Sequence, residues 1–303
     1  MNDLAARVRR CRMVRGLSAS VVVSAVAFGA IAPASADDRP KPPKGVVEVP
    51  APEPPEISGV AAVPGGYAVV GDDTNDHGRI WPSGGRWFID PPVTGPESLD
   101  VGVGPQGAPL WLILGEDKRT LADLSGGRYV FPDAYREVCG RGLEGLAVRW
   151  HEGAWQVAAL WEGGFYRRPC TAPKAFAKPR VAILTWADGV GTTGPQREFE
   201  LDVPRPDDGE RFRAPDLVWH GDGLLVLLSS QDKKDKRFSH TWLQRFDLDG
   251  EPTGTPLKLE KEWGTYRDKK NWEALDWTLD GTRLVLGFDT KKDDSVLAVF
   301  PYR

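Results

Sequence analysis

The sequence predicts an all-β chain folded as a β-propeller, with five blades favoured and six blades as the alternative. The chain has 303 residues with 34 glycines and 26 prolines, and short apolar or alternating runs recur between turn residues, which is typical of β-strands. A second observation is a repeat with a period of several tens of residues, which indicates a propeller or a related array.

Each repeat begins with an acidic residue, followed by a short apolar run and a turn. The clearest copy is Glu144-Gly145-Leu146-Ala147-Val148. The predicted repeat starts are Glu56, Glu97, Glu144, Asp216 and Glu273. Three further strand-like runs follow most of these starts, and four short strands are the content of one propeller blade.

The further strands are expected in the following order along the chain. They are residues 67–70, 79–81 and 86–89 in the first repeat, 110–114, 121–124 and 128–131 in the second, 155–160, 180–186 and 198–203 in the third, 224–228, 241–247 and 256–259 in the fourth, and 283–288 and 295–301 in the last.

The last repeat has only three strands before the chain stops. The run Val46-Val47-Glu48-Val49, ahead of the first repeat, can supply its missing outer strand and close the ring. Closure removes the open sheet edges that otherwise invite aggregation. The six-blade alternative stays open because 72 positions separate Glu144 from Asp216.

The first 36 residues have the pattern of a secretory signal peptide. Five arginines precede an apolar run at residues 17–32, and Ala34-Ser35-Ala36 provides a small-residue cleavage site. The apolar run is too short for a transmembrane span. We therefore expect a signal peptide at 1–36, a Pro-rich linker at 37–44 and the propeller domain at 45–303, in a protein that is secreted or held at the cell envelope.

Removing this leader takes away five arginines and one aspartate. The formal charge then changes from −4 to −8, because 34 basic residues face 42 acidic ones. This acidic balance argues against non-specific nucleic-acid binding, and we expect a monomer.

Of the three cysteines, Cys11 leaves with the leader, and the remaining pair predicts a disulfide between Cys139 and Cys170 in an exported chain.

The acidic repeat starts predict a metal site at one mouth of the channel. The innermost strand of every blade starts at the same face, so these carboxylates are expected to converge. Clustered carboxylates raise one another's pKa, and Ca²⁺ relieves this repulsion with a flexible shell of oxygen ligands. The predicted ligands are Glu56, Glu97, Glu144, Asp216 and Glu273.

The acidic repeat starts also have an alternative role, in which they accept hydrogen bonds from backbone N–H groups and bridge the blades. When the fourth repeat is aligned on Trp219 and the last on Trp277, Asp216 falls one residue late, and a shift by one residue turns a strand side chain to the opposite face. The four histidines are scattered, which argues against zinc.

Basic residues are expected around the same mouth. They include Arg141, Arg167, Arg213 and Lys270. Cations beside a metal centre suit a small anionic ligand or a phosphate ester, whereas the plainer interpretation is a solvated charged surface.

With these residues in place, the chain resembles secreted propellers of the phytase-like group, described as having esterase-like activity of phytase. The resemblance lies in Glu56-Ile57-Ser58-Gly59, Leu143-Glu144-Gly145-Leu146-Ala147 and Asn271-Trp272-Glu273-Ala274-Leu275. The stretch from Glu56 to Asp73 is also similar to calcium-activated nucleotidases, which have five blades and a tunnel Ca²⁺. The resemblance implies a Ca²⁺ site and hydrolysis of a phosphate ester.

Three functions follow as hypotheses. The first is a Ca²⁺-dependent phosphoric ester hydrolase with one of the repeat-start glutamates as base, the catalytic residues being unassigned. The second is a non-catalytic binding module of the cell envelope with a structural metal, contacting its ligand through Trp87, Trp161 and Trp263. The third, a glycoside-processing enzyme, needs two carboxylates across a sugar cleft and ranks last.

Overall fold

The computed structural model describes residues 42–51, 57–71, 79–82, 89–136, 142–163, 178–203, 210–232, 238–259, 271–289 and 296–302. The chain divides into two compact units, residues 1–39 and residues 40–303. Every described residue belongs to the second unit. No helix in these described ranges has the length and apolar character needed to span a bilayer.

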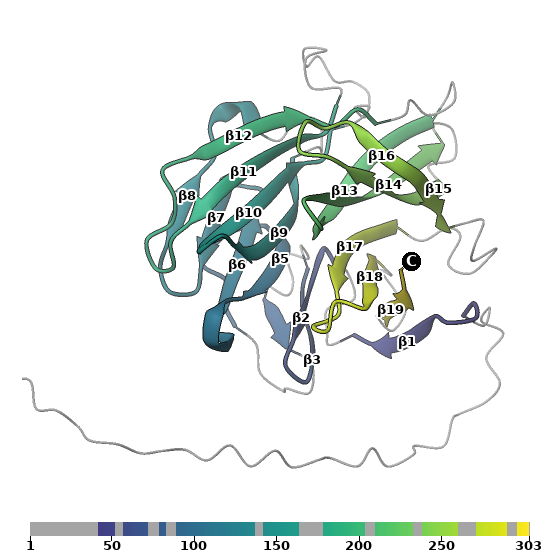
Figure 1. The fold of residues 1–303 in the computed structure, drawn as a ribbon, viewed down its shortest axis with the longest axis horizontal. Helices are drawn as coiled ribbons and strands as arrows, with labels where there is room; N and C mark the ends of the chain where they lie inside the picture. The colour runs from purple at the N-terminus through teal and green to yellow at the C-terminus, as the bar shows by residue number, and fades with distance from the viewer. Residues whose placement is uncertain are drawn as a thin grey trace, which may run out of the picture. The chain divides into compact units, whose positions relative to one another are not determined.

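Five antiparallel sheets form five blades arranged in a ring, which confirms the all-β propeller with five blades rather than six (Figure 1). In the described part of the chain, two short 3-10 helices, Pro105–Gly107 and Asp133–Tyr135, lie between consecutive strands.

The strands are grouped by blade as follows. Blade 1 holds β2 (Gly59–Val63), β3 (Gly66–Val70) and β4 (Ile80–Pro82); blade 2 holds β5 (Pro96–Val103), β6 (Pro109–Gly115), β7 (Thr120–Asp123) and β8 (Arg128–Val130); blade 3 holds β9 (Leu143–His151), β10 (Ala154–Trp161), β11 (Arg180–Trp186) and β12 (Pro195–Glu200); blade 4 holds β13 (Glu210–His220), β14 (Gly223–Asp232), β15 (Phe238–Phe246) and β16 (Pro252–Lys258); blade 5 holds β17 (Asn271–Trp277), β18 (Arg283–Asp289), β19 (Val296–Pro301) and β1 (Val47–Pro50).

The N-terminal strand closes the ring as predicted. β1 pairs antiparallel with β19, from Val47 opposite Val299 to Pro50 opposite Val296. This pairing gives blade 5 its fourth strand although the strand comes from the far end of the domain, and it covers the free edge of β19.

The outer strands of blades 3 and 4 both begin earlier than predicted, that of blade 4 covering Pro252–Lys258 in place of 256–259. The outer strand of blade 3 covers Pro195–Glu200, whereas the apolar pattern predicted 198–203. Leu201 and Val203 are buried, but they pack in the interface with blade 4 beyond the end of the strand. Their hydrophobicity therefore reports packing between blades and not pairing within the sheet. The predicted strand at 86–89 lies mostly outside the described residues, and Ile89 forms a single bridge with Ile80.

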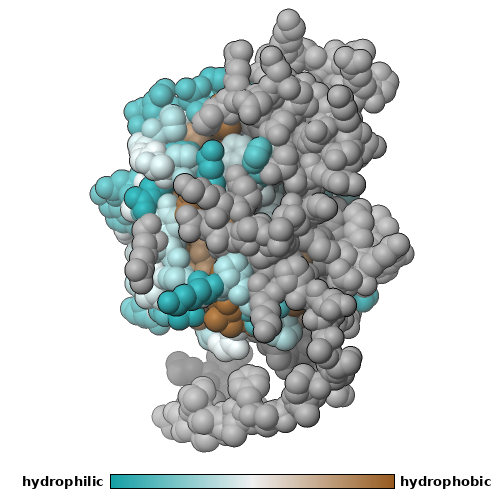
Figure 2. Space-filling view, turned by 90° about the vertical axis from the view of Figure 1, so that its right-hand side faces the viewer, coloured by the Kyte–Doolittle hydropathy of each residue, from teal (hydrophilic) through white to brown (hydrophobic). Residues whose placement is uncertain are grey.

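The hydrophobic core is divided into five clusters, each between two neighbouring blades. Alternation along a strand explains this division, because successive side chains point to opposite faces of a sheet. In β6, Leu112 packs toward blade 3 and the next residue, Ile113, packs toward blade 1. On the face drawn in Figure 2, the described residues are mostly hydrophilic, with small hydrophobic areas among them.

The inner strands form the wall of the channel. β2, β5, β9, β13 and β17 each contact the inner strands of both neighbouring blades, which completes a ring of five. All five are the first strands of their blades, so they share one direction along the channel. Residues at the starts of these strands therefore meet at one mouth, and residues at their ends meet at the other.

Candidate functional site

The three predicted glutamates that the structure describes stand at β-bulges where inner strands begin. Glu97, Glu144 and Glu273 are each an extra residue in the pairing with the second strand of the blade. A bulge bends the strand and redirects one side chain. In blade 4 the irregularity lies between Arg213 and Asp216, which places the Arg213 side chain in this region in place of another acid.

The Arg213 guanidinium lies among three glutamates from two other blades. Its Nε is 2.8 Å from Glu162 Oε2 in blade 3, and its Nη1 is 2.9 Å from Glu273 Oε1 in blade 5. Its Nη2 is 3.7 Å from Glu144 Oε2, also in blade 3. We call Glu144, Glu162, Arg213 and Glu273 the guanidinium cluster. It joins blades 3, 4 and 5 at the start of the channel.

Burial makes the charges of this cluster strongly interdependent. Only 13% of the Arg213 side chain is exposed, and Glu162 is fully buried. Burial alone would lower the pKa of Arg213, but the charges of Glu162, Glu273 and Glu144 outweigh it and raise that pKa. The arginine therefore stays charged, as arginines generally do.

The surroundings of Glu144 favour its neutral form, whereas those of Arg213 favour its charged form. Burial raises the pKa of Glu144 well above its usual value, and the negative charges of Glu162, Glu97 and Glu116 raise it further against the opposing effect of Arg213. Glu97 and Glu116 thus lie close enough to Glu144 to act on its charge, in addition to the glutamates that contact Arg213.

The two glycines of the Gly142-Leu143-Glu144-Gly145 stretch make room for carboxylates of other blades. A Cβ at Gly142 would collide with the Glu116 side chain of blade 2. A Cβ at Gly145 would lie 2.9 Å from Asp216 Cα and 3.0 Å from its Oδ1 in blade 4. The motif is therefore a packing site for acids from both neighbouring blades, in addition to carrying one of its own.

Asp216 lies apart from the glutamates and bridges three blades. Its Oδ1 accepts hydrogen bonds from the N–H groups of Leu146 and Leu217, and its Oδ2 accepts one from Leu275. These donors belong to β9, β13 and β17. Asp216 thus follows the alternative considered for the acids, in which a carboxylate bonds backbone N–H groups across blades.

Two aspartates that the sequence analysis did not select have the same role. Asp100 accepts hydrogen bonds from the N–H groups of Val101 and Val148, which joins blade 2 to blade 3. Asp276 accepts them from Trp277 and Ala62, which joins blade 5 to blade 1. We call Asp100, Asp216 and Asp276 the aspartate set.

A spacing in the sequence could have revealed both groups. Glu97 precedes Asp100 by three residues, Glu273 precedes Asp276 by three, and Arg213 precedes Asp216 by three. Arg213 therefore occupies in blade 4 the position that a glutamate occupies in blades 2 and 5.

The other predicted site residues lie outside the described part of the chain. They are Glu56, Arg141, Arg167, Lys270 and both cysteines of the predicted disulfide, Cys139 and Cys170. Of the tryptophans proposed as ligand contacts, Trp87 and Trp263 also lie outside it. Trp161 is 1% exposed, so its prediction as a surface contact is wrong: it packs in the cluster between blades 2 and 3.

The described residues fit Ca²⁺ poorly. Ca²⁺ takes about six to eight oxygen ligands, and the Arg213 guanidinium already contacts the oxygens of three of the glutamates. Within the described ranges, no group of three or more His, Cys, Asp or Glu side chains is arranged to hold a metal ion. The calcium site remains a prediction, since Glu56 is not described.

Comparisons with known proteins identify no family for this chain. No protein-family model matches it, and no curated protein matches its sequence. Similar solved structures include a hypothetical protein from Leishmania major (TM-score 0.37, 11% identity, covering 78% of this chain and 79% of that one). Another is an endo-arabinase from Bacteroides thetaiotaomicron (TM-score 0.37, 14% identity, covering 78% of this chain and 89% of that one). Similarity this low says nothing about what this chain binds.

Replacing Arg213 by glutamine tests the guanidinium cluster. We expect the free energy of unfolding to fall by about 3–5 kcal/mol, because buried carboxylates then lose their compensating charge. Urea denaturation at neutral pH measures the loss. The matched control is Arg197→Gln, which removes an ion pair with Asp249 whose two side chains are 44% and 77% exposed and should cost less than about 1 kcal/mol. Equal costs for the two variants would contradict a structural role for Arg213.

The buried acids also predict how stability depends on pH. Burial raises the pKa of Asp100 from 3.8 to about 7, and burial likewise raises the pKa values of Glu144, Asp216 and Asp276. The folded state therefore binds protons that the unfolded state has released, so stability falls as pH rises between about 4 and 7. Urea denaturation should give a larger free energy of unfolding at pH 5 than at pH 8.

An opposing effect acts only in stronger acid. Hydrogen bonds from Thr278 and Thr282 lower the pKa of Asp280 to about 2, so its contribution is lost only below about pH 4. A stability that increases steadily from pH 5 to pH 8 would contradict the buried state of these acids.

Proposed function

We propose that the protein is an exported five-bladed propeller that binds a small molecule without catalysis, and that Arg213 takes the structural place of a channel metal. The contact of the Arg213 guanidinium with Glu144, Glu162 and Glu273 supports this proposal. Export through the leader at residues 1–36 and display at the cell envelope belong to the same proposal.

This proposal depends on which positive charge compensates the acids at the channel mouth. In a metal-centred propeller the ion neutralises the acids that converge on the channel, and here a guanidinium contacts them. Arg213 offers hydrogen-bond donors and no lone pair, so it cannot ligate an ion. A divalent cation among the same glutamates would also be repelled by its positive charge. The described residues thus support a structural role for this mouth.

The competing function is Ca²⁺-dependent hydrolysis of a phosphate ester, and one observation favours it. Besides burial, the negative charges of Glu162, Glu97 and Glu116 all raise the pKa of Glu144, and a cation among these acids would relieve that repulsion. In that case the ion would polarise a phosphoryl oxygen and activate water when bound, and a glutamate such as Glu144 or Glu97 would accept a proton.

Thermal melting with Ca²⁺ or EDTA separates the two functions. We expect the wild-type midpoint to be the same in both, because a ligand stabilises a protein only when the folded state binds it. We also expect no hydrolysis in a panel of phosphomonoesters, nucleotides and phytate supplied with Ca²⁺.

The Arg213→Gln variant sharpens the comparison. Without the guanidinium, the glutamates have lost a compensating positive charge that Ca²⁺ can supply. Ca²⁺ should therefore raise the melting midpoint of this variant, although we expect no rise in the wild type. A midpoint that rises with Ca²⁺ in the wild type, together with turnover of any phosphate ester, would overturn the binding-module proposal.

A further inference from the structure

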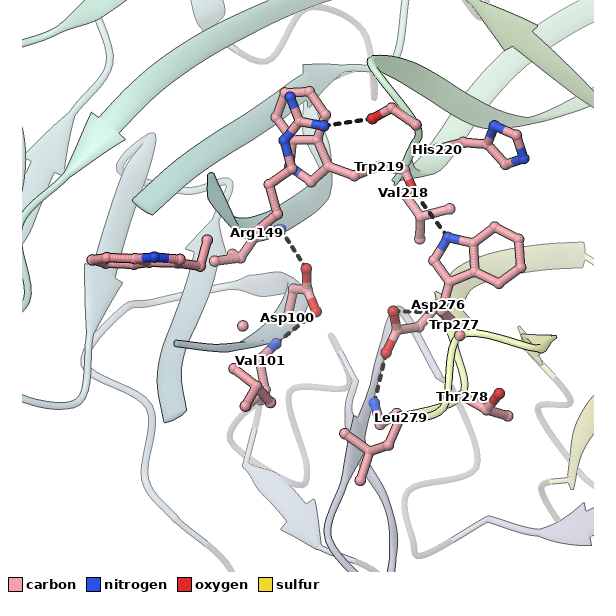
Figure 3. Close-up of a pocket in the computed structure, with 17 residues that line it drawn as sticks. Asp100, Val101, Arg149, Val218, Trp219, His220, Asp276, Trp277, Thr278 and Leu279 are labelled. Carbon is pink, nitrogen blue, oxygen red and sulfur yellow. Dashed lines mark hydrogen bonds between the residues drawn. The ribbon is translucent and has the colours of Figure 1, made fainter. Parts of the chain in front are cut away.

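A pocket opens at the channel mouth opposite the guanidinium cluster. Residues of all five blades line it, and those of β5, β9, β13 and β17 come from the later parts of these inner strands or the turns after them. The cavity has a volume of about 580 Å³, and pockets of roughly 300–1,000 Å³ are typical of small-molecule sites. We call it the channel pocket (Figure 3).

Two carboxylates lie in this pocket. Asp100 and Asp276 approach it from different blades (Figure 3), and Asp216 lies outside its lining. The hydrogen bonds of Asp100 and Asp276 come from backbone N–H groups. Neither forms an ion pair with a described basic residue. Each carboxylate oxygen has a second lone pair with which it can accept from a ligand.

Among the described residues that line the pocket, the one arginine is turned to other partners. The Arg149 guanidinium stacks over the Trp219 ring, with Cζ 3.8 Å from the ring centroid. It donates hydrogen bonds to the Gly221 carbonyl and the Gln156 side chain. In Figure 3 the Arg149 side chain overlaps the Trp219 ring and lies away from Asp276. The positive charge of Arg149 therefore stays on the wall of the pocket.

Apolar side chains concentrate at the rim of the same pocket. Seven large hydrophobic residues are exposed among those described, and three of them, Val103 at 50%, Trp150 at 38% and Leu279 at 51%, line this pocket. Trp150 meets Trp155 edge to face. Apolar exposure gathered around a concave site indicates a ligand surface.

We infer that the channel pocket binds a small organic ammonium compound, with its charge at Asp100 and Asp276 and its apolar groups against Val103, Trp150 and Leu279. This inference rests on the proposed binding function and names its ligand class. An anion would meet two carboxylates, and a purely apolar ligand would leave them desolvated without a partner. A cation with alkyl substituents satisfies the acids and can also contact the face of an aromatic ring.

Proton binding should compete with such a cation. Burial raises the pKa of Asp100 to about 7 and that of Asp276 well above its usual range. Other titratable groups in this region include Asp216, whose pKa burial also raises, Arg149, and His220, whose pKa burial lowers. Tyr67, on which Asp276, Asp280 and Arg283 act, lies near Asp276 as well. Because ammonium binds the ionised carboxylates, affinity should rise as pH increases from 6 to 8.

Calorimetric titration of the full exported chain tests the inference with a matched pair of probes. Choline carries a trimethylammonium group, and 3,3-dimethylbutan-1-ol has the same shape without the charge. We expect choline to bind roughly tenfold more tightly than the alcohol, the size of a desolvated cation–π contact, and to bind more tightly at pH 8 than at pH 6. Equal binding of both probes, or no binding of choline, would overturn the inference.

Variants locate the binding to this pocket. Trp150→Ala changes an exposed rim residue and should weaken choline binding several-fold, whereas Leu124→Ala, an exposed residue outside the pocket lining, should leave it unchanged. Asp276→Asn should remove the preference for choline over the alcohol. Retention of full affinity in Trp150→Ala and Asp276→Asn would also overturn the inference, as would binding of neutral sugars in place of choline.

The outcome separates this inference from the proposed function. Melting that does not depend on Ca²⁺, without phosphate ester hydrolysis and without choline binding, refutes the ammonium site alone. Ca²⁺-dependent melting with hydrolysis refutes the non-catalytic function, whatever choline does.

Discussion

The contact between the Arg213 guanidinium and the glutamates of blades 3 and 5 is the interaction on which the channel depends. A propeller brings the starts of its inner strands together at one mouth, so repeated acids must meet there. Ionised carboxylates in a buried site destabilise the fold unless a positive charge compensates them. One arginine at the repeat position of blade 4 supplies that charge from within the chain and joins three blades.

Further along the same channel, buried aspartates have backbone N–H groups as partners in place of a guanidinium. The aspartate set uses backbone N–H groups of neighbouring blades as partners, so each carboxylate adds polar contacts between sheets whose interfaces also hold hydrophobic clusters. Burial raises the pKa values of these aspartates, and the hydrogen bonds from backbone N–H groups offset that rise only in part. Two of the aspartates line a pocket that a ligand can enter. The two mouths of one channel thus differ in chemistry, one holding an ion-pair cluster and the other offering acids within an apolar rim.

Sequence patterns predicted the blades well because each blade repeats the same local rules. Short alternating runs between turns located most strands, and the missing strand of the last repeat correctly indicated that the N-terminal run closes the ring. The outer strand of blade 3 was misplaced because Leu201 and Val203 are apolar for packing between blades. Local pattern does not distinguish a residue buried by its own sheet from one buried by the next.

The partners of the site residues were harder to predict because they depend on pairing register and on contacts between blades. Asp216 was grouped with the glutamates by its place in the repeat, but the irregularity of β13 between Arg213 and Asp216 gives it backbone partners instead. Arg213 was expected on a ligand rim, since sequence alone does not show that the nearest anions belong to the protein. The spacing of three residues shared by Arg213 and Asp216, Glu97 and Asp100, and Glu273 and Asp276 could have indicated that Arg213 stands at a glutamate position, but it does not show which carboxylates contact the guanidinium.

A double-mutant cycle between Arg213 and Glu273 measures this interaction most directly. The free energies of unfolding of the wild type, Arg213→Gln, Glu273→Gln and the double variant yield the coupling between the two side chains. We expect a coupling of about 1–3 kcal/mol, with the double variant less destabilised than the sum of the single changes, because removing both charges leaves fewer uncompensated groups. Effects that add to within about 0.5 kcal/mol would show that the guanidinium does not hold the glutamates together.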